Sequence, residues 1–90
     1  MSELSVPALQ TYVGGMIQIN DHERKYVIGG QVTKIELSGA DINVFYQSVD
    51  DDGDPHTNHY GIDLPHFHNG GPAGVFVSDT YHVTLTFTPP

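Results

Sequence analysis

Hydrophobic residues recur at every second position along most of this chain, which is the period of a half-buried β-strand. The alternation predicts strands over residues 16–19, 25–37, 41–49, 74–78 and 81–88. Helical signals are confined to residues 5–13, where Ser5 suits an N-cap and Pro7 is tolerated in a first turn. Gly14 and Gly15 would end that helix. We therefore expect an all-β protein with at most one short N-terminal helical turn.

The longest predicted strand, 25–37, is interrupted by Gly29 and Gly30. Ile35 and Leu37 share one face after the glycines, whereas Val32 is out of phase with them. A glycine pair combined with a phase change indicates a bulge or a sharp bend. Such a bend would let one strand serve both sides of a small antiparallel barrel or sandwich of about five strands, either SH3-like or OB-like.

The strand phases also predict which residues form the core. These residues are Ile17, Ile19, Ile35, Leu37, Val44, Val83, Leu85 and Phe87. A chain of 90 residues can bury only one modest core, so residues 1–90 are expected to be a single domain.

Residues 50–73 show almost no periodicity and are punctuated by glycine and proline, which predicts a long irregular loop. Loops of this length in a compact domain are often functional. Residues 50–71 hold four of the six histidines and five of the eleven acidic residues, with no Lys or Arg. This segment is therefore the candidate site.

The charge of the chain is concentrated in its second part. The net charge is −8, and residues 39–90 contain seven aspartates without any Lys or Arg. A negative field repels nucleic acid and membrane surfaces and attracts basic proteins or cations. We expect no direct binding to nucleic acid or membranes, because phosphate binding depends on Lys and Arg.

Our first functional hypothesis is a non-enzymatic interaction protein that binds a basic partner protein. Aromatic residues with an acidic rim suit such a partner. The candidate contact residues are Asp50, Asp51, Asp52, Asp54, Tyr60, Asp63 and Phe67. Small acidic proteins without cysteine are common among phage-encoded inhibitors of host nucleases, so an inhibitor of a nuclease or of a nucleic-acid-binding complex is one form of this hypothesis.

The alternative hypothesis is a domain that binds a metal or a small ligand through histidine and aspartate. On extended backbone, His66 and His68 would point to the same side with their Cα atoms about 6.5 Å apart. His56 and His59 are three residues apart, as suits one helical turn. Imidazole and carboxylate ligands favour zinc or another first-row divalent metal. The spacing matches neither the HExxH motif nor an EF-hand, in which Pro55 would replace the glycine.

Other function classes have less support in the sequence. The chain has no cysteine, no nucleophile elbow and no phosphate-binding loop, so we do not expect an enzyme. A subunit of a larger assembly, for example a phage structural protein, is a further alternative. The chain has no apolar run of about 18 residues, and its first ten residues lack the features of a signal peptide, so a cytoplasmic protein is expected.

Overall fold

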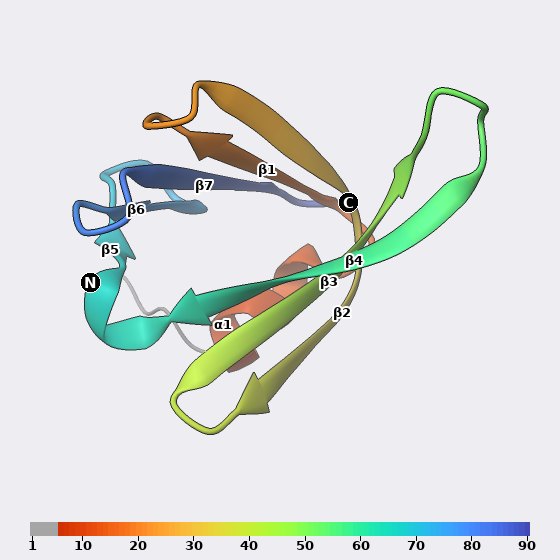
Figure 1. The fold of residues 1–90 in the computed structure, drawn as a ribbon. Helices are drawn as coiled ribbons and strands as arrows, with labels where there is room; N and C mark the ends of the chain where they lie inside the picture. Colours follow the sequence, from red (N-terminus) through yellow and green to blue (C-terminus); the bar gives the residue numbers. More distant parts are fainter. Residues whose placement is uncertain (1–5) are drawn as a thin grey trace.

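The computed structural model describes residues 6–90, which form one short helical segment followed by a seven-stranded antiparallel sheet (Figure 1). The elements are α1 (Val6–Leu9), the 3-10 turn η1 (Gln10–Tyr12), β1 (Met16–Asp21), β2 (Tyr26–Ser38), β3 (Asp41–Val49), β4 (Pro55–Asp63), the 3-10 turn η2 (Leu64–His66), β5 (His68–Asn69), β6 (Val75–Ser78) and β7 (Val83–Thr88). The prediction of an all-β chain with one short N-terminal helix is confirmed, while Ser5 lies outside the described residues. None of the helices within residues 6–90 has both the length and the apolar character needed to span a membrane.

The sheet folds back on itself because β2 belongs to both of its halves. The strand order is β4-β3-β2-β1-β7-β6-β5. Residues 26–31 of β2 pair with β1, and residues 31–38 pair with β3. Figure 1 shows the half that contains β1, β7 and β6 facing the half that contains β2, β3 and β4. The two edge strands, β4 and β5, are not neighbours in this sheet, so it is open and not a closed barrel.

The expected number of about five strands is wrong, and the expected irregular loop over 50–73 is wrong for residues 55–63, which form β4. β4 pairs along the full length of β3, from Asp41 opposite Asp63 to Val49 opposite Pro55. Residues 55–59 of this strand are exposed, and only Tyr60 and Ile62 are drawn toward the core. Main-chain hydrogen bonds to β3 therefore hold β4 in the sheet. Such bonds do not require apolar side chains, so the sequence of β4 shows no alternation of apolar and polar residues.

Two glycines allow β2 to pass between the backbones of its neighbours. A Cβ atom on Gly29 would collide with the carbonyl oxygen of Ile17 in β1, and a Cβ on Gly30 would collide with that of Gln47 in β3. The predicted bend lies at these glycines. The phase change lies slightly later, where the pairing register shifts between Val32 and Lys34. This bulge brings both Val32 and Ile35 into the core.

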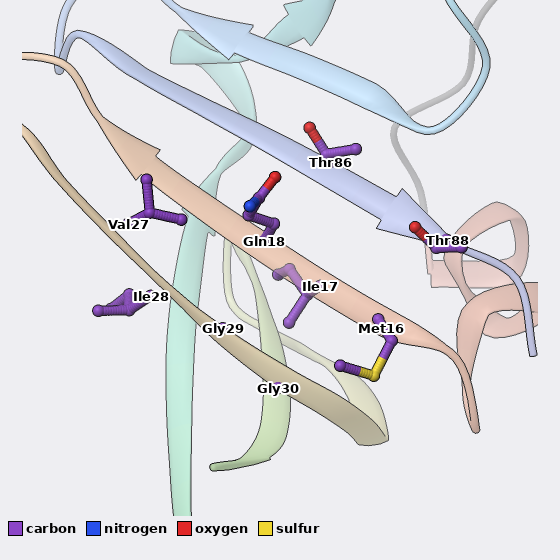
Figure 2. Close-up of a pocket in the computed structure, with 9 residues that line it drawn as sticks. All are labelled: Met16, Ile17, Gln18, Val27, Ile28, Gly29, Gly30, Thr86 and Thr88. Carbon is purple, nitrogen blue, oxygen red and sulfur yellow. The ribbon is translucent and has the colours of Figure 1, made fainter. Parts of the chain in front are cut away.

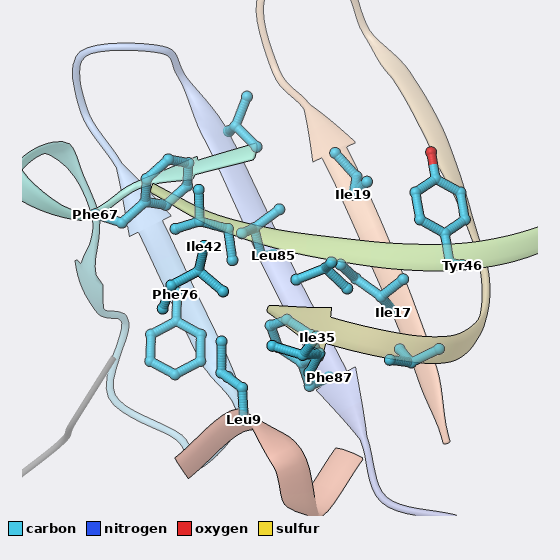
Figure 3. Close-up of a cluster of buried hydrophobic side chains, with 14 residues drawn as sticks. Leu9, Ile17, Ile19, Ile35, Ile42, Tyr46, Phe67, Phe76, Leu85 and Phe87 are labelled. Atoms are coloured by element: carbon cyan, nitrogen blue, oxygen red, sulfur yellow. The ribbon is translucent and has the colours of Figure 1, made fainter. Parts of the chain in front are cut away.

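The core fills the space between the two halves of the sheet (Figure 3). Its buried residues are Leu9, Ile17, Ile19, Val32, Ile35, Ile42, Val44, Tyr46, Ile62, Phe67, Phe76, Val83, Leu85 and Phe87. Seven of the eight predicted core residues are among them. The exception is Leu37, which is 62% exposed. It lies on the inner face opposite Ile42, but at the end of β2 beside the turn to β3, where nothing covers it.

The helical segment closes one side of the core. Leu9 of α1 is fully buried, and Tyr12 of η1 stacks on Phe87 with ring centroids 5.1 Å apart. The side-chain amide of Gln10 donates a hydrogen bond of 3.0 Å to the carbonyl oxygen of Ile35. These contacts attach α1 to both halves of the sheet.

Replacing Leu85 by Ala should lower the free energy of unfolding by about 2–5 kcal/mol, because it leaves a cavity at a fully buried position. The same substitution at the exposed Leu37 should cost no more than about 0.5 kcal/mol. Urea unfolding followed by circular dichroism measures both changes. Equal losses at the two positions would contradict the inner-face assignment of β7.

Replacing Gly30 by Ala should lower the free energy of unfolding by about 1–3 kcal/mol or more, since the new methyl group must displace main-chain atoms. Gly61→Ala in β4 is the matched control. Its Cβ would lie 3.4 Å from Oδ1 of Asn43, a distance that small shifts relieve. Thermal unfolding of the two variants compares the sites, and similar melting temperatures would contradict the close approach at Gly30.

Candidate binding site

The β3–β4 hairpin ends in an acidic turn that the side chain of Asp50 organises. Its Oδ1 accepts hydrogen bonds of 2.9 Å from the backbone N–H groups of Asp52 and Asp54. Its backbone carbonyl accepts a further bond of 3.0 Å from the N–H of Gly53, which has a positive φ of 86°. Asp50 therefore has a structural role in the turn.

His56 reinforces the same turn from the start of β4. Its Nε2 lies 2.7 Å from Oδ2 of Asp50, as in a charge-assisted hydrogen bond. This bond, followed by the backbone N–H of Asp54, lowers the pKa of Asp50 below its ordinary value. Both oxygens of the Asp50 carboxylate are thus engaged within the hairpin.

The remaining acids of the turn point into solvent. Asp51, Asp52 and Asp54 are exposed, and no Lys or Arg of residues 6–90 forms an ion pair with them. One ligand oxygen from each of Asp50, Asp52 and Asp54 lies within 4.8 Å of the others. Since the turn itself accounts for the position of Asp50 and occupies its oxygens, this proximity is explained without a metal ion.

The structure does not bring the four candidate metal-binding histidines together. His56 lies at the tip of the hairpin, whereas His59 lies on the side of the sheet where its ring packs 5.6 Å from that of Phe45. His66 in η2 and His68 in β5 follow the opposite end of β4. Among residues 6–90, the Asp50, Asp52 and Asp54 cluster is the one group of three potential ligands close enough to share an ion.

Of the other predicted contact residues, Tyr60 lies within β4, about 17 Å along the strand from Pro55, while Asp63 ends the strand and Phe67 follows it. Phe67 is only 7% exposed and belongs to the core, so it cannot serve as the expected surface contact. It packs edge-on against Tyr60, with ring centroids 6.4 Å apart, and lies 6.1 Å from the ring of Tyr81. The hydroxyl of Tyr81 donates a 3.0 Å hydrogen bond to Oδ2 of Asp63.

A cleft of about 380 Å³ opens between the two halves of the sheet at this end of the core. Four of the five tyrosines of the chain line it, namely Tyr26, Tyr46, Tyr60 and Tyr81. They come from β2, β3, β4 and the turn before β7. Burial raises the pKa of Tyr46 and of Tyr60, and the negative charge of Asp21 adds to the shift of Tyr60.

Charged residues of the β1–β2 turn form the rim of this tyrosine cleft. Oδ1 of Asp21 accepts the backbone N–H groups of Glu23 and Arg24, at 3.1 and 3.0 Å. The guanidinium of Arg24 lies 3.9 Å from Oδ2 of Asp21, and its side chain is 71% exposed. Its hydrogen bond with the hydroxyl of Tyr26 raises the pKa of Arg24.

Of the residues that line the tyrosine cleft, the sequence indicated Tyr60 as a contact residue and His59 as a metal ligand. Tyr26, Tyr46 and Tyr81 lie far apart along the chain, and each resembles an ordinary strand residue. Only the fold of the sheet brings them together. The pairing of Asp21 opposite Tyr26 places both on the inner face, which strand alternation alone could have indicated.

A second depression of about 430 Å³ lies along β1, β2 and β7 (Figure 2). Gly29 and Gly30 contribute no side chains to it, and the exposed Met16 and Val27 flank it. It has no charged lining residue. Its polar side chains are those of Gln18, Thr86 and Thr88, so unlike the tyrosine cleft it offers no charged group that would bind an ionic ligand.

Comparison with models of known protein families, with curated proteins and with solved structures finds no significant match. An inference about function therefore rests on the residues of this chain.

Replacing His56 by Ala should raise the pKa of Asp50 toward the ordinary value of about 3.9. A lowered pKa in the folded state means that the Asp50 carboxylate stabilises the turn above its unfolded pKa, and that this contribution disappears as pH falls through the folded pKa. Carboxyl carbon NMR titration measures the change. His59→Ala, on the same strand, should leave the titration of Asp50 unaltered, and an unaltered titration in His56→Ala as well would contradict the Asp50–His56 bond.

Proposed function

We propose that this chain is a non-enzymatic binding domain that engages a basic protein through its acidic surface. One observation carries the proposal: among the described residues, none of the seven aspartates in 39–90 forms an ion pair with Lys or Arg. The ion pairs of Arg24 and Lys34 are made with Asp21 and Glu36, in the first part of the chain. The negative field of the second part is therefore left for an external partner.

The hairpin tip is where this field is most concentrated. Asp51, Asp52 and Asp54 are adjacent like charges, which repel one another and do not stabilise the turn. The turn is held by the side chain of Asp50 and by backbone groups, so these three carboxylates could be lost without loss of the fold. Their placement supports a role in attracting a partner.

The shape of the hairpin suits a basic groove on that partner. Figure 1 shows the β3–β4 hairpin extending away from the two facing halves of the sheet. Residues 55–59 of β4 are exposed along this extension. A nuclease or a nucleic-acid-binding complex presents a groove of the required charge, so an inhibitor that occupies part of such a groove is one form of this function.

Replacing Asp51, Asp52 and Asp54 together by Asn should slow association with a basic probe about tenfold at low salt, because exposed charges act mainly on the rate of encounter. The probe is a fluorescent deca-arginine peptide, measured by stopped flow. The matched control is Glu36→Gln, Asp41→Asn and Asp79→Asn, which removes the same charge away from the hairpin tip and should slow association much less.

Salt provides the second measurement. Binding of the unmodified chain should weaken steeply as ionic strength rises, since charges are screened beyond about 8 Å at physiological salt. Lack of binding to deca-arginine at low salt would refute the proposed function. If the two triple variants slowed association equally, the proposal of a basic partner would stand, but the hairpin tip would not be its binding surface.

A further inference from the structure

We propose that the tyrosine cleft receives an arginine side chain of the basic partner, beside the rim position that Arg24 of this chain occupies. This inference rests on the proposed function and extends it, because it names the group that is bound and the place that binds it. The hairpin tip and the tyrosine cleft are then two separate parts of one acidic binding surface.

The lining of the cleft has the chemistry that a guanidinium group requires. Its planar cation stacks on aromatic faces and donates hydrogen bonds to carboxylate and hydroxyl oxygens. The cleft offers both, in the rings of Tyr26, Tyr60 and Tyr81 and in the carboxylates of Asp21 and Glu23. Its volume of about 380 Å³ lies within the range of pockets that hold small ligands, so an arginine side chain has room to enter.

Arg24 shows that a guanidinium group is compatible with this rim. It interacts with the hydroxyl of Tyr26 and with the carboxylate of Asp21. Its side chain is 71% exposed, and the 3.9 Å ion pair is long, so little free energy opposes its displacement. An arginine of the partner would gain the aromatic contacts deeper in the cleft that Arg24 leaves open to solvent.

The balance of charge favours a cation over an anion in the cleft. With His59 counted as neutral at pH 7, Asp21 and Glu23 outnumber the single positive charge of Arg24 among its lining residues. A further carboxylate, that of Asp63, is hydrogen-bonded to the hydroxyl of Tyr81. The effect of Asp21 on the pKa of Tyr60 is consistent with this negative environment.

The first experiment titrates the chain with a blocked single arginine, N-acetylarginine amide, and follows the tyrosine ring signals by NMR. The signals of Tyr26, Tyr60 and Tyr81 should shift, while that of Tyr12, which stacks on Phe87 outside the cleft, should not. Tyr26 is 41% exposed, so Tyr26→Leu should keep the fold. It should weaken binding of both N-acetylarginine amide and deca-arginine about fivefold to thirtyfold.

The matched control is Phe45→Leu. It removes an aromatic ring from the opposite face of β3, where Lys34 already lies 5.4 Å from the ring centroid. This variant should bind both probes as the unmodified chain does. Leu85 methyl signals report whether each variant retains the core.

The second experiment tests the sign of the ligand charge. Arg24→Gln should strengthen arginine binding about twofold to fivefold, because it removes the competing guanidinium group. Lys25→Gln, which changes the net charge equally at the neighbouring exposed residue, should change binding less than about twofold. Weaker binding in Arg24→Gln would overturn the inference, since Arg24 would then contribute to binding and would not compete with the ligand.

The outcomes separate this inference from the proposed function. Suppose that Tyr26→Leu does not change the binding of deca-arginine and that N-acetylarginine amide shifts no tyrosine signal. This result would overturn the arginine site in the cleft, while the proposal of a basic partner would stand. Tyrosine shifts that Tyr26→Leu abolishes would support the cleft even where the hairpin variants bind normally. If no tyrosine signal shifts and deca-arginine does not bind, both the arginine site in the cleft and the proposed function are overturned.

Discussion

The close approach of three backbones at Gly29 and Gly30 is the constraint on which the rest of the structure depends. At this point β2 leaves β1 and joins β3, and a side chain on either residue would meet a neighbouring carbonyl group. Without this passage the sheet would be an extended seven-stranded layer with one face uncovered. The bend turns that face inward, so the two halves of the sheet bury each other and a small chain obtains a core.

The same bend creates the candidate binding site. Asp21 and Tyr26 belong to the half formed with β1, whereas Tyr46 and Tyr60 belong to the half formed by β3 and β4. They meet at the end of the core where the two halves diverge, leaving the tyrosine cleft between them. Its shape therefore depends on the angle at the glycines, and a change in that angle would alter the site without touching a residue that lines it.

The sequence predicted the parts of the fold that depend on burial and missed those that depend on main-chain pairing. Val83, Leu85 and Phe87 alternate because one face of β7 is buried, and their phase was correct. β4 escaped prediction because its first five residues are exposed and show no alternation. Leu37 was correctly assigned to the inner face of its strand, but it lies beyond the part of the sheet that the other half covers. The alternation of residues along a strand does not show how far the facing half of the sheet extends. Asp51, Asp52 and Asp54 were recognised as exposed charges, whereas the tyrosine cleft joins residues too distant in sequence for any local pattern to connect.

The acidic turn and the tyrosine cleft would contribute differently to binding. Carboxylates at the hairpin tip are solvated and screened by salt, so they can accelerate encounter but hold a partner weakly. The cleft is partly desolvated, since Tyr46 is buried and Tyr60 is partly buried, and a cation within it gains aromatic contacts that salt screens less. About 17 Å of β4, from Pro55 to Tyr60, separates the two sites, so one small cation cannot reach both. A protein with a basic groove can, and this separation is the reason to expect a macromolecular partner for this chain over a small cation.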